Sequence, residues 1–100
     1  MVKHIVLWKL KDAAEGRSAH ENALLLKQNL ESLTGKIKEI VSLQVGLNFN
    51  PSEAAYDVAL YTEFNTKEDL LAYRNHPEHV KVAELIGKVR DKVVVVDYED

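Results

Sequence analysis

Residues 2–10 read Val-Lys-His-Ile-Val-Leu-Trp-Lys-Leu, a run of β-branched and aromatic side chains that is typical of a β-strand. Ile5 and Leu7 point to one face of this strand, and His4 and Trp8 point to the other, because side chains alternate along a strand. Both faces are largely apolar, whereas an antiparallel sheet exposed to water keeps one polar face. We therefore expect both faces of this strand to be covered.

A helix is expected to follow a polar loop. Ser18 and Glu21 have the spacing of a capping box, in which each side chain satisfies a free amide of the first helical turn. Thr34-Gly35 supplies a stop signal. The apolar residues between these signals recur every three or four positions, as on one face of a helix: Ala19, Ala23, Leu26, Leu30 and Leu33.

Two further strands are predicted in the middle of the chain. Residues 37–49 alternate between apolar and polar side chains, and residues 56–64 do the same. Asn50-Pro51-Ser52 separates them and is typical of a turn. We expect these two strands to pair as neighbours.

The last third of the chain predicts a broken helix and a final strand. Thr66 begins a short helix, and Pro77 interrupts it and begins another, because proline fits the first helical turn. Gly87 is expected to end the second helix. Residues 91–98 then form a strand with an apolar run, Val93–Val96, that suits coverage on both faces.

The order strand, helix, strand, strand, helix, strand is the ferredoxin-like pattern, an α+β fold with an antiparallel four-stranded sheet and helices on one face. We expect the first and last strands in the chain to be the central pair. The second sheet face still needs a cover, and for so short a chain the simplest cover is a second copy of itself. The sequence therefore predicts a homodimer.

Composition sets limits on function. The 100 residues are 46% hydrophobic and 29% charged, which predicts a single globular domain over residues 1–100. The net charge of −3 argues against nucleic-acid binding, and no apolar run approaches the roughly 20 residues of a membrane span. The absence of cysteine excludes thiolate catalysis and cysteine zinc sites. No apolar stretch typical of a secretory signal follows Met1, so we expect a cytoplasmic protein.

Four residues are candidates for a site: His4, Tyr73, His79 and Asp97. An imidazole can take up a proton near neutral pH, a carboxylate can orient it, and a tyrosine hydroxyl can stabilise a carbonyl that gains negative charge. Together they would abstract a proton next to a carbonyl without a cofactor. The structural alternative is that these histidines bond only to backbone and that Asp97 bonds to solvent.

Two other interpretations stay open. His76 and His79 are three residues apart, and with Glu78 or Asp97 they suggest a metal site, although Pro77 places His76 at or before the helix start. Trp8, next to His4 on its strand face, either lines a ligand pocket or is simply part of the core.

Three segments carry a resemblance to a known family. They are Val2 to Lys9, Tyr73-Arg74-Asn75-His76-Pro77-Glu78-His79-Val80 and Val96-Asp97-Tyr98. Together they resemble the stress-responsive α/β-barrel domain (Dabb) family along essentially the whole chain. The resemblance implies a dimeric α+β barrel of ferredoxin-like protomers. Most members of this family have no established role, while plant members include heat-stable stress proteins and a polyketide cyclase that forms olivetolic acid.

The resemblance to the cyclase implies roles for individual residues. His79 aligns with its catalytic base, Asp97 with the carboxylate that orients the base, and Tyr73 with the assisting tyrosine. His4 aligns with a pocket histidine, whereas a second pocket histidine is replaced here by Val58. This replacement leaves the substrate open.

Two classes of function remain. In the first, these residues form a small-molecule pocket, lined also by Val6, Trp8, Val58 and Val95, that catalyses cofactor-free proton transfer or cyclisation of a carbonyl compound. In the second, the protein is a non-enzymatic dimeric stress or interaction protein with a filled interior. A monooxygenase of the wider dimeric barrel group has little direct support in the residues.

Overall fold

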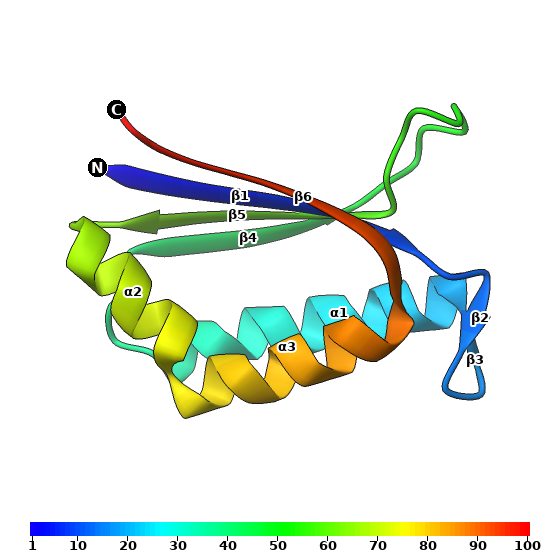
Figure 1. Ribbon diagram of the computed structural model, residues 1–100, viewed down its shortest axis with the longest axis horizontal. Helices are drawn as coiled ribbons and strands as arrows, with labels where there is room; N and C mark the ends of the chain where they lie inside the picture. The colour runs from blue at the N-terminus through cyan, green and yellow to red at the C-terminus, as the bar shows by residue number, and fades with distance from the viewer.

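The computed structural model describes residues 1–100 and places two layers against each other, a sheet and a group of helices (Figure 1). The elements follow the predicted order, with a small added hairpin after the first strand. Their bounds are β1 Val2–Leu10, β2 Ala13–Ala14, β3 Arg17–Ser18, α1 Ala19–Ser32, the 3-10 turn η1 Leu33–Gly35, β4 Ser42–Leu47, β5 Val58–Phe64, α2 Lys67–Asn75, α3 Pro77–Val89 and β6 Arg90–Glu99.

The main sheet is antiparallel, with the strand order β4-β5-β1-β6. The first strand is central, as predicted, but the prediction that the last strand is also central is wrong. β6 lies at the edge because it pairs only with β1, whereas β5 pairs with both β1 and β4 and takes the second central place. The register of β1 and β6 sets His4 opposite Asp97 and Leu10 opposite Arg90.

Alternation along β1 divides its side chains between two environments, as the sequence predicts. Val2, Val6 and Trp8 are buried against the helices together with the polar residue His4. Leu7, on the opposite face, is exposed. All three helices lie on the same side of the sheet (Figure 1).

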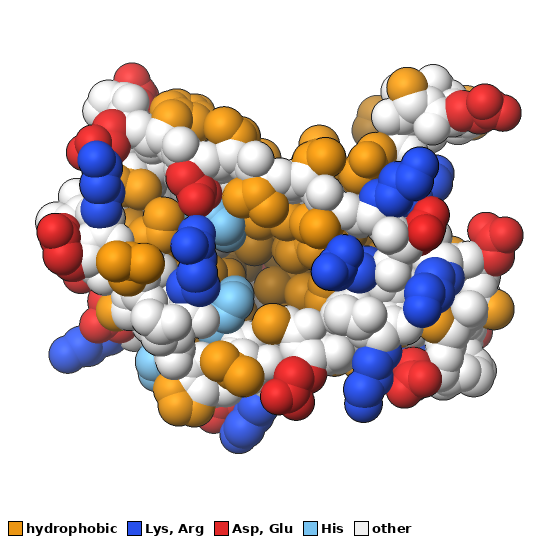
Figure 2. Space-filling model, viewed as in Figure 1, with side chains coloured by type: hydrophobic (Ala, Val, Ile, Leu, Met, Phe, Trp, Pro, Cys, Tyr) orange, Lys and Arg blue, Asp and Glu red, His pale blue; other side chains and the backbone are white.

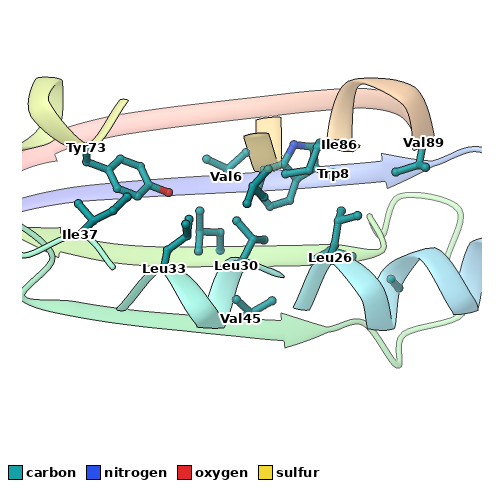
Figure 3. Close-up of a cluster of buried hydrophobic side chains, with 14 of the residues drawn as sticks. Val6, Trp8, Leu26, Leu30, Leu33, Ile37, Val45, Tyr73, Ile86 and Val89 are labelled. Atoms are coloured by element: carbon teal, nitrogen blue, oxygen red, sulfur yellow. The ribbon is translucent and has the colours of Figure 1, made fainter. Parts of the chain in front are cut away.

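The capping box predicted for α1 is present. The backbone N–H of Glu21 donates to the Ser18 hydroxyl, and the backbone N–H of Ser18 donates to the Glu21 carboxylate. Further along, Leu26, Leu30 and Leu33 point from this helix and its 3-10 extension into the core (Figure 3). The apolar spacing in the sequence therefore identified the buried helix face.

The strand predicted over residues 37–49 is shorter, since β4 spans only Ser42–Leu47. Ile37 is buried, but it continues the 3-10 turn, with its N–H donating to the Leu33 carbonyl. At the other end, Phe49 is 98% exposed. The predicted strand was therefore too long at both ends, because the loop residues on either side of it continue the alternation of apolar and polar side chains.

The last two helices meet at His76. Thr66 caps α2 and Pro77 begins α3, as predicted. The prediction that Gly87 ends α3 is wrong, because the helix continues to Val89, which is completely buried, and turns directly into β6. Gly87 has no positive φ angle, so it does not act as a helix stop here.

The sheet face away from the helices, which we call the open face, is uncovered within one protomer. Its apolar residues are Ile5, Leu7, Ala59, Tyr61, Val94 and Val96. Every residue of β6 is exposed, so the apolar run in this strand has no partner in the single chain. No helix is long and apolar enough to cross a membrane.

Candidate functional site

A cavity of about 350 Å³ lies between the sheet and α3, and we call it the helix-side cavity. Figure 2 shows a hollow lined by hydrophobic side chains, with histidines beside it and basic side chains on either side. The residues that line the cavity come from β1, β5, the start of β6 and all three main helices: His4, Val6, Trp8, Leu30, Leu60, Tyr73, Arg74, His79, Val82, Ala83, Ile86, Gly87 and Arg90.

A chain of polar contacts holds His4 at this cavity. The His4 Nδ1 atom lies 2.5 Å from Asp97 Oδ1, and Arg74 Nη2 donates to Asp97 Oδ2 at 3.2 Å. The Thr62 hydroxyl donates to the backbone carbonyl of His4 at 3.0 Å. Because an ionised carboxylate only accepts hydrogen bonds, the His4 Nδ1 atom carries the proton of this contact. The second ring nitrogen, Nε2, is not bonded to Asp97.

The pairing expected between His79 and Asp97 is wrong. Asp97 contacts His4 and Arg74, while His79 Nδ1 donates to the backbone carbonyl of Arg74 at 3.0 Å. The reason is the register of β6 against β1, which sets Asp97 opposite His4. The structure therefore brings His4 and Asp97 together and orients His79 by a backbone group instead.

The Tyr73 ring lies near both histidines. Its ring centroid is 4.5 Å from that of His79 and 6.0 Å from that of His4. The residue is only 1% exposed, and its hydroxyl has no hydrogen-bond partner in the protein. In Figure 3 this hydroxyl points inward, toward Val6 and Leu33. A buried hydroxyl without a partner is energetically unfavourable, and it is a ready donor to a ligand in the cavity.

Burial changes the titration of two groups in the site. It lowers the pKa of His79, and the hydrogen bond to the Arg74 carbonyl offsets only part of this effect. Burial also raises the pKa of Tyr73 to about 12. At neutral pH the site therefore holds a neutral imidazole beside a protonated phenol, which is the combination needed for a base and a hydrogen-bond donor.

The structure separates the predicted apolar lining residues into two groups. Val6 and Trp8 lie in the wall of the helix-side cavity. Val58 is fully buried at the first position of β5 and does not line the cavity. Val95 does not line the cavity either, because it lies on the edge strand β6, where it is 55% exposed.

Several cavity residues were missed by reasoning from the sequence, Arg74, Gly87 and Arg90 among them. A signal for the last two was available. From His79 onward, the lining residues of α3 and its C-terminal cap fall at the spacing of one helical face: His79, Val82, Ala83, Ile86, Gly87 and Arg90. Extending that face beyond Gly87 required knowing that the helix continues.

The metal interpretation of the His76 segment has no geometric support. His76 Nδ1 accepts from the backbone N–H of Glu78 at 3.1 Å, so this ring caps α3. No group of three or more His, Asp or Glu side chains lies close enough together to hold a metal ion.

Comparison with known proteins agrees with this fold. The family model of the stress responsive A/B barrel domain matches residues 2–100. A stress-response A/B barrel domain-containing protein of Arabidopsis thaliana is 29% identical over 100 residues, which cover 98% of this chain and 36% of that protein. The chain thus spans about a third of the length of this curated relative.

Solved structures give the same result. A dimeric protein of unknown function with a ferredoxin-like fold, from Bacteroides fragilis, is 37% identical, with a TM-score of 0.83, 99% of this chain and 95% of that chain covered. The hydroxynitrile lyase from Passiflora edulis is 21% identical, with a TM-score of 0.80 and coverage of 97% and 90%.

The fold and the family match together classify the chain. It is a ferredoxin-like α+β protein. It belongs to the stress-responsive A/B barrel domain family.

Proposed function

We propose that this chain forms a homodimer in which each protomer uses the helix-side cavity for cofactor-free proton transfer on a carbonyl compound. The fold alone assigns no activity, because it is shared by a hydroxynitrile lyase and by proteins of unknown function. The proposal therefore depends on the geometry of the cavity and on the chemistry of its polar end.

The base in this reaction is His79. Its Nδ1 proton is held by the Arg74 carbonyl, so the neutral ring has its lone pair on Nε2. Burial keeps the ring neutral by lowering its pKa. The proton of the substrate C–H bond next to the carbonyl passes to Nε2, and the electron pair of that bond forms the enolate. The proton on Nε2 then returns to carbon, which restores the ketone, or it passes to the oxygen of a second carbonyl whose carbon has bonded to the enolate carbon.

The observation that carries the proposal is the buried Tyr73 hydroxyl, which has no protein partner and belongs to a ring that packs against His79. A protonated phenol in this position can donate to the carbonyl oxygen, where negative charge develops as the enolate forms. Donors of this kind are most effective in a site with little water. Tyr73 and His79 would then act on adjacent atoms of one substrate.

His4 and Asp97 have a positioning role in this proposal. Asp97 orients His4 rather than the base, and Arg74 holds the second carboxylate oxygen. His4 is 7% exposed and lines the same cavity. It therefore helps to hold the carbonyl end of the ligand.

The dimer is formed by the open face. A second copy would bury the apolar residues that one protomer leaves exposed, including Leu7, Val94 and Val96. The segment between β4 and β5 rises from the sheet on this side (Figure 1), and beside it lies a hollow of about 480 Å³. The Bacteroides fragilis protein, 37% identical to this chain, is dimeric.

Exchange of hydrogen for deuterium next to a carbonyl tests the activity without knowledge of the natural substrate. Methyl hexyl ketone is incubated in deuterated buffer with the wild type, His79→Gln or His20→Gln, and the loss of the proton signals is followed by NMR. We expect enzyme-dependent exchange that falls about a hundredfold in His79→Gln. His20, a histidine on α1 that does not line the cavity, is the matched control.

Exchange that is equally fast in His79→Gln would reject His79 as the base. No exchange with the wild type would favour the alternative function, a non-enzymatic stress or interaction protein. The apolar open face is the feature of the chain that favours this alternative.

A further inference from the structure

The helix-side cavity is elongated, and its two ends differ in chemistry. Its lining residues on α3 run from His79 to Gly87, which is about 12 Å at the rise of an α-helix, and Arg90 follows at the start of β6. Those on β1 run from His4 to Trp8, about 13 Å along a strand. The sheet register fixes the direction, because Asp97 lies opposite His4 at one end and Arg90 lies opposite Leu10 at the other.

The part between these ends is apolar. It is lined by Val6, Leu30, Leu60, Val82, Ala83 and Ile86. Gly87 adds no side chain, and a Cβ atom built there has no heavy atom within 4 Å. A helical glycine that faces a cavity in this way leaves room for a ligand.

The end of the cavity at Arg90 carries a positive charge that is not paired with another group of the protein. The Arg74 guanidinium is paired with Asp97, but the Arg90 guanidinium has no ion pair and no hydrogen bond. Arg90 is exposed, so its charge is accessible from solvent while its side chain lines the cavity. A planar guanidinium is well suited to bind a carboxylate through two hydrogen bonds.

We infer that the cavity binds an elongated apolar carboxylate, with the carboxylate at Arg90, the apolar body against Trp8 and Ile86, and a carbonyl group at Tyr73 and His79. This inference rests on the proposed function in taking the same cavity as the site. It adds the substrate class, which is an oxo acid whose carbonyl and carboxylate are separated by a hydrocarbon body. Arg90 is the residue that selects for the charge, and Gly87 is the residue that permits the length.

Binding can be measured without any catalysis, because Trp8 is the only tryptophan in the chain and lines the cavity. Octanoate and its neutral counterpart octanamide are titrated while Trp8 fluorescence is followed. We expect the wild type to bind octanoate more tightly than octanamide. The preference of the wild type for octanoate should be about fivefold, the effect of one partly exposed ion pair, and Arg90→Gln should abolish it.

Lys88→Gln is the matched control, since it removes the same charge two residues before Arg90, at a residue that does not line the cavity. This variant should keep the preference for octanoate. Gly87→Leu tests the length. Its side chain occupies the open space in the cavity and should weaken binding of both probes, whereas Gly87→Ala should weaken it much less.

Three results would overturn the inference. They are equal binding of octanoate and octanamide by the wild type, an equal loss of preference in Arg90→Gln and Lys88→Gln, and no response of Trp8 to either probe. None of them decides the proposed function, because exchange on methyl hexyl ketone involves no carboxylate. Conversely, charge-dependent binding without exchange would identify a binding protein and retain the role of Arg90.

Discussion

The Nδ1 atom of His79 lies 3.0 Å from the backbone carbonyl oxygen of Arg74. The side chain of the same arginine donates to Asp97, which holds His4. Arg74 therefore contacts one cavity histidine through its backbone and the carboxylate that orients the other through its side chain. The two histidines are positioned by one residue, although 75 positions separate them in the chain.

Arg74→Gln separates these two contacts. The backbone carbonyl remains, so the hydrogen bond to His79 should persist, whereas Asp97 loses its charged partner and should hold His4 less firmly. We expect the His4 Nδ1 proton to exchange with solvent about fivefold faster, as loss of a weak surface ion pair implies. NMR of the imidazole protons measures this rate. Lys67→Gln, which removes an exposed ion pair with Glu99, should leave it unchanged.

The protonation of His79 sets how the exchange rate depends on pH on the acidic side. Because burial lowers its pKa, His79 stays neutral to a pH below its ordinary value of 6.5, and the exchange rate should be retained down to that pH. The Tyr73 pKa of about 12 predicts no loss of rate on the basic side between pH 7 and about pH 10. A pH profile of the exchange rate checks both the acidic and the basic side. A midpoint above 6.5 on the acid side would contradict this assignment.

The same shift affects stability. The pKa of His79 is lower in the folded than in the unfolded chain, so the unfolded chain binds more protons as the pH falls. The stability that His79 contributes is present above pH 6.5 and is lost as the pH falls from 6.5 through the lower folded value. Urea unfolding between pH 7 and about pH 5 should therefore show a smaller loss of stability in His79→Gln than in the wild type.

Tyr73→Phe should separate stability from activity. Removing a buried hydroxyl without a partner relieves an unfavourable interaction, so the free energy of unfolding should rise by about 1–2 kcal/mol. The exchange rate should fall about a hundredfold, because the donor to the carbonyl oxygen is lost. Urea unfolding and the exchange assay measure the two effects. A less stable variant with full activity would show that the hydroxyl serves the fold and not the reaction.

A charged residue on the open face tests whether this face forms the dimer interface. Val94→Glu places a carboxylate in the centre of the proposed dimer interface, and we expect the mass in solution to change from dimer to monomer. Light scattering after size-exclusion chromatography measures it. Leu24→Glu is the control, since Leu24 is an exposed leucine on the outer side of α1. A wild type that is already monomeric would reject the dimer.

Local signals in the sequence were sufficient for most of the fold. Ser18 with Glu21, Thr66 and Pro77 each fix a helix start through contacts within a few residues, and the structure contains all of them. The errors have a common cause. The ends of β4 and of α3 depend on what Ile37 and Val89 pack against, and this is decided by residues distant in the sequence.

Three of the candidate residues lie at one cavity, but the contacts between the candidates differ from those expected. His4, Tyr73 and His79 all line one cavity, and Asp97 reaches it through His4. Which histidine Asp97 contacts depends on the register of β6 against β1, which sets Asp97 opposite His4. Local patterning does not contain this information, because it concerns how segments from opposite ends of the chain pair.

The protonation state of the His79 ring tests the central claim most directly. Nitrogen NMR of the imidazole rings, in the wild type and in Asp97→Asn, distinguishes the two ring nitrogens and gives the midpoint of titration. We predict a neutral ring at pH 7 with its proton on Nδ1, a midpoint below 6.5, and no change of that midpoint in Asp97→Asn. A ring that is charged at pH 7, that carries its proton on Nε2, or whose midpoint falls when Asp97 is neutralised would contradict the account.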